Sequence, residues 1–297
     1  MKSNHNLIFV LLISAVIFLT SCAGLKEKKE MLSICEKITD GRIKNTCIAI
    51  AEEDAAQCDK ISDNQENVDE KGFCYMAVAL KTKKASICEK PHIPKFTCKA
   101  LVENSSSGCD EALQKEPYGM NCYVRSAELT KNPDLCDRYA QAVGIQGVQT
   151  LECKALIEKD ATKCSKEDLP KCYFATASLK GDAAICDSIP NAPYIPNIQK
   201  VKEMCNAVAK RDVSALDCKV EFKPATTWEE SIVTYKACIA VAALTEDAST
   251  CDKIVIKGDW VSPDPNPIDK CYHNIILLKS GVFPIETVIN SLDRIWG

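Results

Sequence analysis

The arrangement of the cysteines constrains the fold of this chain more than any other feature of its sequence. There are 19 cysteines in 297 residues, and 18 of them follow Cys22. These 18 fall into two kinds that alternate strictly along the chain. One kind lies in apolar, alanine-rich segments, and the other in shorter segments that begin with a polar residue. The sequence therefore predicts an array of helical hairpins, each with one cysteine in each helix.

Nine cysteines belong to each kind. Cysteines of the first kind are expected to open the longer helix of a hairpin: Cys47, Cys74, Cys98, Cys122, Cys153, Cys172, Cys205, Cys238 and Cys271. Cysteines of the second kind are expected in the short helix: Cys35, Cys58, Cys88, Cys109, Cys136, Cys164, Cys186, Cys218 and Cys251. The stretch 171–189, KCYFATASLKGDAAICDSI, contains one complete hairpin.

A helix-start signal precedes seven of the nine second-kind cysteines. Four residues before the cysteine stands a side chain that can accept a hydrogen bond from the free N–H groups of a first helical turn. These residues are Asp54, Ser105, Asn132, Asp160, Asp182, Ser214 and Asp247. Met31 and Lys84 break the rule at the two remaining positions. The second-kind cysteine is therefore expected one turn inside its helix.

A longer period of about 50 residues overlies the hairpins, because CKALVE at 98–103 nearly repeats as CKALIE at 153–158. A repeat of four helices with four cysteines predicts an all-α fold, either an α-solenoid or a compact curled repeat, stapled by disulfides. We expect this domain over residues 31–280, followed by a C-terminal capping helix at 281–297.

Two pairing schemes fit the cysteine spacing. Pairing within each hairpin, from Cys47–Cys58 through Cys238–Cys251, leaves Cys35 and Cys271 without partners. Pairing across the linkers gives all 18 of these cysteines a partner. An exported chain with an even number of cysteines therefore favours this scheme. That scheme gives Cys35–Cys47, Cys58–Cys74, Cys88–Cys98, Cys109–Cys122, Cys136–Cys153, Cys164–Cys172, Cys186–Cys205, Cys218–Cys238 and Cys251–Cys271. Sequence alone leaves both schemes open.

The alternative use of so many cysteines, as metal ligands, fits the sequence less well. Structural zinc and iron–sulfur sites bring cysteines together as C-x2–4-C, and the chain has no such spacing. After Cys22 only His92 and His273 could supply imidazole, and each is expected to be structural. We therefore expect no metal, no cofactor and no catalytic residue. The formal net charge of −4 and the lack of a basic block make nucleic acid an unexpected partner.

The N-terminus has the features of an export signal. Lys2 precedes an apolar run over Leu7–Leu19, which ends in Leu19-Thr20-Ser21-Cys22. This tetrapeptide resembles the lipobox of prokaryotic lipoproteins, and the resemblance implies lipidation of Cys22 and cleavage just before it, which removes residues 1–21. Residues 23–30 would then form a polar tether. An ordinary secretory signal with a chance cysteine, or an uncleaved anchor, are the alternatives.

The repeats also resemble, in concept, disulfide-stapled hairpin arrays such as the Sel1-like cysteine-rich proteins. They lack the glycines between helices and the tight cysteine spacing of that family, so the resemblance implies no activity and no site residue.

The repeat loosens after residue 187, where proline-containing linkers lengthen and all three tryptophans occur. Insertions in repeat proteins gather on one face, which is often the binding face. Tyr194, Phe222, Trp228 and Trp260 could form a recognition surface there. Alternatively, these aromatic side chains fill gaps between the longer loops.

Together these features predict an exported lipoprotein, anchored through Cys22 on the extracytoplasmic side of a membrane. Non-catalytic binding of an envelope protein or surface ligand, or a structural role in the envelope, is the expected function. An envelope enzyme whose site forms no motif, and a thiol redox protein, are the alternatives.

Overall fold

The protein is described by a computed structural model that covers residues 25–64, 68–117, 119, 121–144, 148–165, 170–191, 197–221, 228–257 and 266–291. Regular structure in these segments is helical except for two strands of three residues, β1 (Lys219–Glu221) and β2 (Val255–Lys257), which pair in parallel. The all-α, disulfide-stapled class predicted from the sequence is confirmed.

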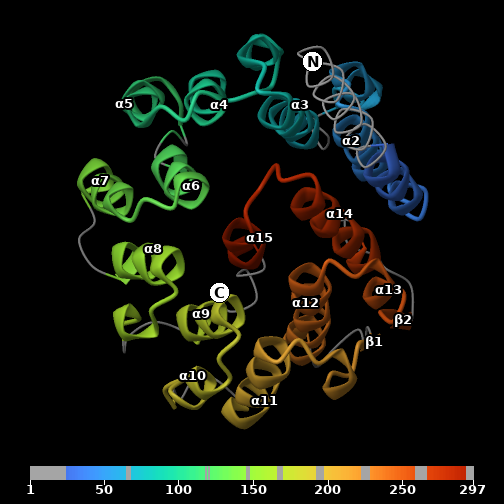
Figure 1. Ribbon diagram of the computed structural model, residues 1–297, viewed down its shortest axis with the longest axis vertical. Helices are drawn as coiled ribbons and strands as arrows, with labels where there is room; N and C mark the ends of the chain where they lie inside the picture. Colours follow the sequence, from blue (N-terminus) through green and yellow to red (C-terminus); the bar gives the residue numbers. More distant parts are fainter. Residues whose placement is uncertain are drawn as a thin grey trace, which may run out of the picture.

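Two sets of helical elements alternate along the described chain. The inner helices are α2 (Gly41–Glu52), α3 (Val68–Thr82), α4 (Lys95–Val102), α6 (Asn121–Thr130), α8 (Val148–Glu158), α9 (Lys171–Lys180), α11 (Ile198–Ala209), α12 (Trp228–Thr245) and α14 (Pro267–Lys279). The outer elements are the N-terminal helix 25–35, η1 (Ala55–Lys60), η2 (Ala85–Glu89), α5 (Ser106–Lys115), α7 (Asp134–Val143), η3 (Ala161–Lys163), α10 (Ala184–Asp187), η4 (Val213–Ala215) and α13 (Ala248–Cys251). Figure 1 shows outer elements such as α5, α7, α10 and α13 at the rim.

The array of hairpins closes into a ring. Each inner helix contacts the next one, and α14 contacts α2, so the series returns to its start (Figure 1). Asp269, which is 1% exposed, accepts hydrogen bonds from the backbone N–H of Thr39 at 2.9 Å and of Asp40 at 2.9 Å. Lys37 forms an ion pair with Asp252 at 2.8 Å. The sequence left two forms open, an α-solenoid and a compact curled repeat, and the structure has the compact one.

The same turn joins the inner helix to the following outer element in eight hairpins of the described chain. The first or second residue after the helix has positive φ, and the next N–H donates to the carbonyl of an alanine five residues earlier, as in a Schellman motif. The positive-φ residues are Glu53, Lys83, Asn104, Lys131, Lys159, Gly181, Arg211 and Glu246. The accepting alanines are Ala49, Ala79, Ala100, Ala127, Ala155, Ala177, Ala207 and Ala242. These alanines are at most 4% exposed. Because their side chains are small, the outer element can approach the inner helix closely.

Nine disulfides join each outer element to the inner helix of the next unit. They link Cys35–Cys47, Cys58–Cys74, Cys88–Cys98, Cys109–Cys122, Cys136–Cys153, Cys164–Cys172, Cys186–Cys205, Cys218–Cys238 and Cys251–Cys271. These are the nine pairs of the scheme that joins cysteines across the linkers. Their Cα–Cα distances run from 5.4 to 5.9 Å, within the usual range for a disulfide.

The short helices differ from the sequence expectation at several places. Cys164 and Cys218 lie just past the ends of η3 and η4 instead of inside them. Asp212, rather than Ser214, caps the η4 helix, because its carboxylate accepts from the Ser214 N–H at 3.0 Å. Cys35 lies at the C-terminal end of helix 25–35 instead of one turn inside a helix that starts at Met31. Lys84 makes no capping hydrogen bond, in agreement with the broken rule at that position.

Most first-kind cysteines lie further inside their helices than expected. Cys238 is the clearest case, because α12 already begins at Trp228 and includes part of the long linker between Cys218 and Cys238. The linkers 219–237 and 252–270 also contain β1 and β2, which hold these two loops together.

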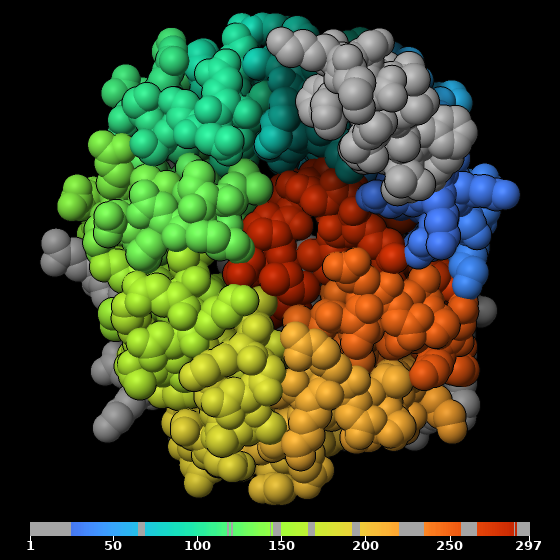
Figure 2. Space-filling model, viewed as in Figure 1, coloured from blue at the N-terminus to red at the C-terminus, as the bar shows by residue number. Residues whose placement is uncertain are grey.

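The two ends of the described chain both pack against the ring. Residues 25–30, part of the predicted tether, are helical, and Glu30 binds Lys279 at 2.8 Å. The predicted C-terminal cap is described over α15 (Ile285–Ser291), which lies in the middle of the ring, where it contacts α6, α9, α12 and α14. Figure 2 shows the repeats surrounding this segment.

Candidate functional site

The described part of the chain does not contain the predicted recognition surface. Tyr194, Phe222 and Trp260 lie outside the described residues, as does the lipidation site Cys22. Trp228 is the first residue of α12, and its side chain is not described. The grouping of these aromatic residues therefore stays a prediction.

The best-defined polar cluster in the described chain lies where α15 meets the ring, and we call it the hub. The Glu286 side chain is 2% exposed, and its carboxylate forms an ion pair with Lys131 and lies 4.0 Å from Lys159. Both lysines are the positive-φ residues of their hairpins, so the repeated turn brings them to equivalent places in successive inner turns. Burial in a low-dielectric interior makes such a carboxylate dependent on its counter-charges.

A second buried carboxylate extends the hub. Glu128, on α6, is 1% exposed and lies 2.8 Å from the Arg125 guanidinium, one helical turn away. The Thr287 hydroxyl, on α15, donates a hydrogen bond to the same Glu128 carboxylate. The hub thus joins α15 to the ring through two buried acids and three basic side chains. Because every one of these groups has a partner inside the protein, we read the hub as architecture.

The two histidines named in the sequence occupy different environments. The His273 ring packs edge-on against Phe73 at 5.6 Å, and its Nε2 atom is buried without a hydrogen-bond partner. Burial lowers the pKa of His273, with the charges of Glu70 and Asp40 acting in the opposite direction, so this imidazole is neutral at neutral pH. His92 is exposed, and its Nε2 lies 3.4 Å from Asp63.

A polar pair lies beside five of the nine disulfides, and the sequence reading missed it. The residue after the outer cysteine is acidic, the residue after the inner cysteine is tyrosine or lysine, and the two side chains bond to each other. The pairs are Asp59–Tyr75, Glu89–Lys99, Asp110–Tyr123, Asp137–Lys154 and Asp252–Tyr272. The signal was visible as an acidic residue directly after seven of the nine second-kind cysteines, matched in five cases by tyrosine or lysine after the partner cysteine.

The Asp110–Tyr123 pair gives a pH-dependent prediction. Burial and the hydrogen bond to Asp110 raise the pKa of Tyr123 to about 12, against an opposing effect of Arg138. Its contribution to stability is therefore present below the ordinary tyrosine pKa near 10 and is lost as the pH rises through about 12. We expect Asp110→Asn to lower the pKa of Tyr123, measured by tyrosinate absorbance after a rapid pH jump.

The neighbouring substitution Glu111→Gln is the control for that titration, because Glu111 is an acidic side chain paired with Lys115 on the surface. Equal tyrosinate titration curves for Asp110→Asn and Glu111→Gln would show that the Asp110 carboxylate does not hold the Tyr123 proton.

The described residues contain no cluster of three or more His, Cys, Asp or Glu side chains suited to a metal ion. In the same segments no helix is both long and apolar enough to span a bilayer. Comparisons with protein-family models, with curated proteins and with solved structures found no match to this chain.

Proposed function

We propose that the protein is a membrane-anchored extracytoplasmic lipoprotein that acts as a non-catalytic binding or structural scaffold of the cell envelope. The observation that carries the proposal is the closed ring stapled by nine disulfides. Disulfides at this density indicate an oxidising, extracytoplasmic environment. The lipobox-like sequence ending at Cys22 supplies the anchor.

Rigidity supports a scaffold role. Neighbouring units are held in fixed positions by the disulfides, by the repeated turn after the inner helices and by the hydrogen bonds of Asp269. The surface of the ring therefore keeps one shape. A surface that is already ordered binds a partner without the entropy cost of ordering it. The buried charges at the hub are held by partners within the chain, which suits a structural element better than a reaction centre.

The anchor is tested by metabolic labelling in a bacterium that processes lipoproteins. The full chain is expressed with an alkyne-bearing fatty acid, and the purified protein is reacted with an azide dye. We expect label on the native chain and none on Cys22→Ser. The matched control is Cys35→Ser/Cys47→Ser, which removes one disulfide and keeps Cys22. It should be labelled as strongly as the native chain.

The location is tested in the same cells by adding protease to the intact outer surface or to the opened envelope. The proposal expects the native ring to be reached only from the extracytoplasmic side. Unlabelled native protein, label that persists in Cys22→Ser, or a ring protected on the cytoplasmic side would each contradict the proposal.

A further inference from the structure

The outward face of the N-terminal helix combines an exposed apolar side chain with two lysines, and a third lysine lies at its edge. Leu25 is 69% exposed, the highest value among the large hydrophobic side chains of the described residues. Lys26 and Lys29 are exposed, and Lys28 is half-buried. None of the three lysines forms an ion pair with a described residue, although the charge of Lys26 reaches Glu30 through space.

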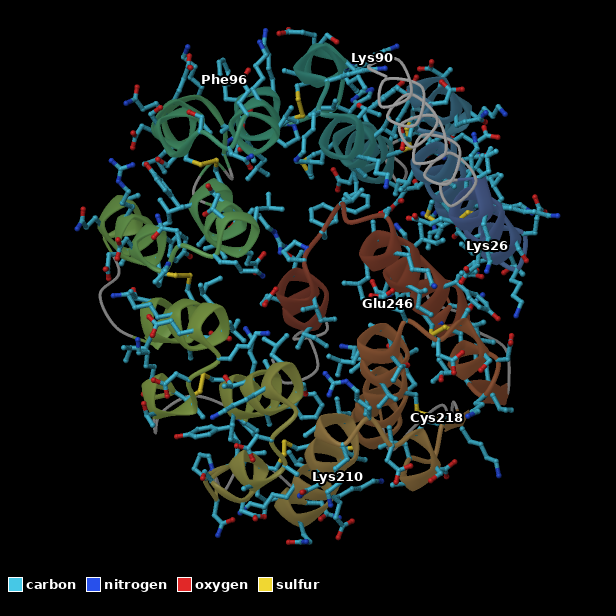
Figure 3. All side chains as sticks on the ribbon, in the orientation of Figure 1. Lys26, Lys90, Phe96, Lys210, Cys218 and Glu246 are labelled. Carbon is cyan, nitrogen blue, oxygen red and sulfur yellow. A yellow bond between two sulfur atoms is a disulfide. The ribbon has the colours of Figure 1, made fainter. Side chains whose placement is uncertain are left out.

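Helical geometry separates this face from the packed one. At about 100° per residue, Leu25, Lys26 and Lys29 lie on the side opposite Met31 and Ile34, and Lys28 lies at the boundary, about 60° from both Leu25 and Met31. Met31 is 4% and Ile34 is 5% exposed, so the packed side is fully used by the ring. Figure 3 shows Lys26 at the outer edge of the molecule.

The charge of this face is positive. Of the two acids in the same stretch, Glu30 is bound to Lys279 at 2.8 Å. Glu27 alone is left beside Lys26, Lys28 and Lys29. A positive face with an exposed leucine has the chemistry that matches an anionic lipid surface.

The sequence places this face next to the proposed anchor. Three peptide units separate Cys22 from Leu25, and a chain of that length reaches at most about 11 Å. The helix itself cannot swing away, because its far end is buried in the ring and the Cys35–Cys47 disulfide fixes it to α2. Resting on the proposed lipidation of Cys22, the start of this helix stays close to the bilayer.

We infer that Leu25, Lys26 and Lys29, with Lys28 at their edge, form a membrane-docking face that binds anionic lipid headgroups and fixes the orientation of the ring. The lipid supplies attachment, and the docking face decides which edge of the ring meets the bilayer. A lysine close to an anionic surface favours the bound state about fivefold. Lysines elsewhere on the ring contribute little, because salt screens their attraction beyond about 8–10 Å.

The first test measures lysine acylation of the lipidated full chain in vesicles. One set contains phosphatidylcholine alone, and the other contains about one-third phosphatidylglycerol in a similar bilayer. We expect Lys26 and Lys29 to react about fivefold more slowly in the anionic vesicles at low salt, and to recover in molar salt. Lys83, Lys210 and Lys219, exposed on other units, should react equally in both.

The second test places a diazirine amino acid at Leu25 and counts lipid adducts after illumination. Lys26→Gln/Lys28→Gln/Lys29→Gln should lose anionic-lipid adducts severalfold. The matched control Lys83→Gln/Lys210→Gln/Lys219→Gln should keep them.

The mass of the N-terminal peptide in the same digests separates the two proposals. Lipid on Cys22 with equal acylation in both vesicle types would overturn the docking face and leave the anchor standing. A peptide without lipid would overturn the proposed anchor, and the docking face with it.

Discussion

Reduction of the nine disulfides is expected to unfold the ring in a urea concentration that leaves the oxidised protein folded. The bridges close short loops, with sequence separations from 8 to 20 residues. In the chain-entropy model each such loop contributes on the order of 2–3 kcal/mol. The measurement is a urea titration by far-UV circular dichroism, with and without reductant.

We expect a large effect because the shortest helical elements are not stable on their own. η3 and η4 have three residues each, and α10 and α13 have four. Isolated helices shorter than about 12 residues are marginal in water, so these elements depend on packing and on their staples. Reoxidised protein is the control and should regain its midpoint. A reduced sample with an unchanged urea midpoint would contradict the stapled-ring account.

The second large effect is expected at the hub. Lys131→Ala/Lys159→Ala removes both counter-charges of the Glu286 carboxylate, whose side chain is 2% exposed. Breaking a buried pair from one side costs about 3–5 kcal/mol. We expect about 3 kcal/mol, the lower end of that range, because the two lysine side chains are 49% and 44% exposed and water replaces part of their effect. Urea unfolding of the oxidised protein measures the loss.

Two further variants isolate the charge effect. Adding Glu286→Gln to the double variant removes the stranded charge and should recover most of the lost stability. Lys83→Ala/Arg211→Ala alters the same positive-φ position in two other hairpins, where no ion pair is present among the described residues. It should cost less than about 1 kcal/mol, as surface substitutions usually do. Equal losses in the two double variants would show that Glu286 does not depend on Lys131 and Lys159.

Local signals in the sequence were sufficient to predict the hairpins. Alternation of two cysteine types and a polar cap before the short helix, as at Asp54 and Asp247, act within a few residues and can be read directly. Parity favoured one pairing scheme because the other would strand Cys35 and Cys271. The Ser214 prediction failed because Asp212, two residues earlier, is also a capping residue, and the fixed offset of four from the cysteine selected the wrong one.

Closure of the ring could not be predicted in the same way. It rests on Asp269 and Thr39, which are 230 residues apart, and a single Asp gives no sign of a partner at that distance. The turn was equally hidden, because seven of its eight positive-φ positions are held by Lys, Glu, Asn or Arg where glycine is the usual signal. The alanine that accepts the turn hydrogen bond was visible only as a small residue in an apolar helix.

The hub depends on both hidden features at once. Lys131 and Lys159 meet Glu286 only because the turn is repeated and the C-terminal helix enters the ring. In the sequence these residues are ordinary charged positions near helix ends. The recognition surface differs from the hub, because its aromatic residues are conspicuous in the sequence. Of these residues, Tyr194, Phe222 and Trp260 lie outside the described segments.

Peptide mapping of the native protein without reduction tests the central claim most directly, because it identifies which outer element is joined to which inner helix. The account predicts nine linkages across the linkers, from Cys35–Cys47 to Cys251–Cys271, and no free thiol after Cys22. Linkages within hairpins, such as Cys47–Cys58, with free thiols at Cys35 and Cys271, would contradict it.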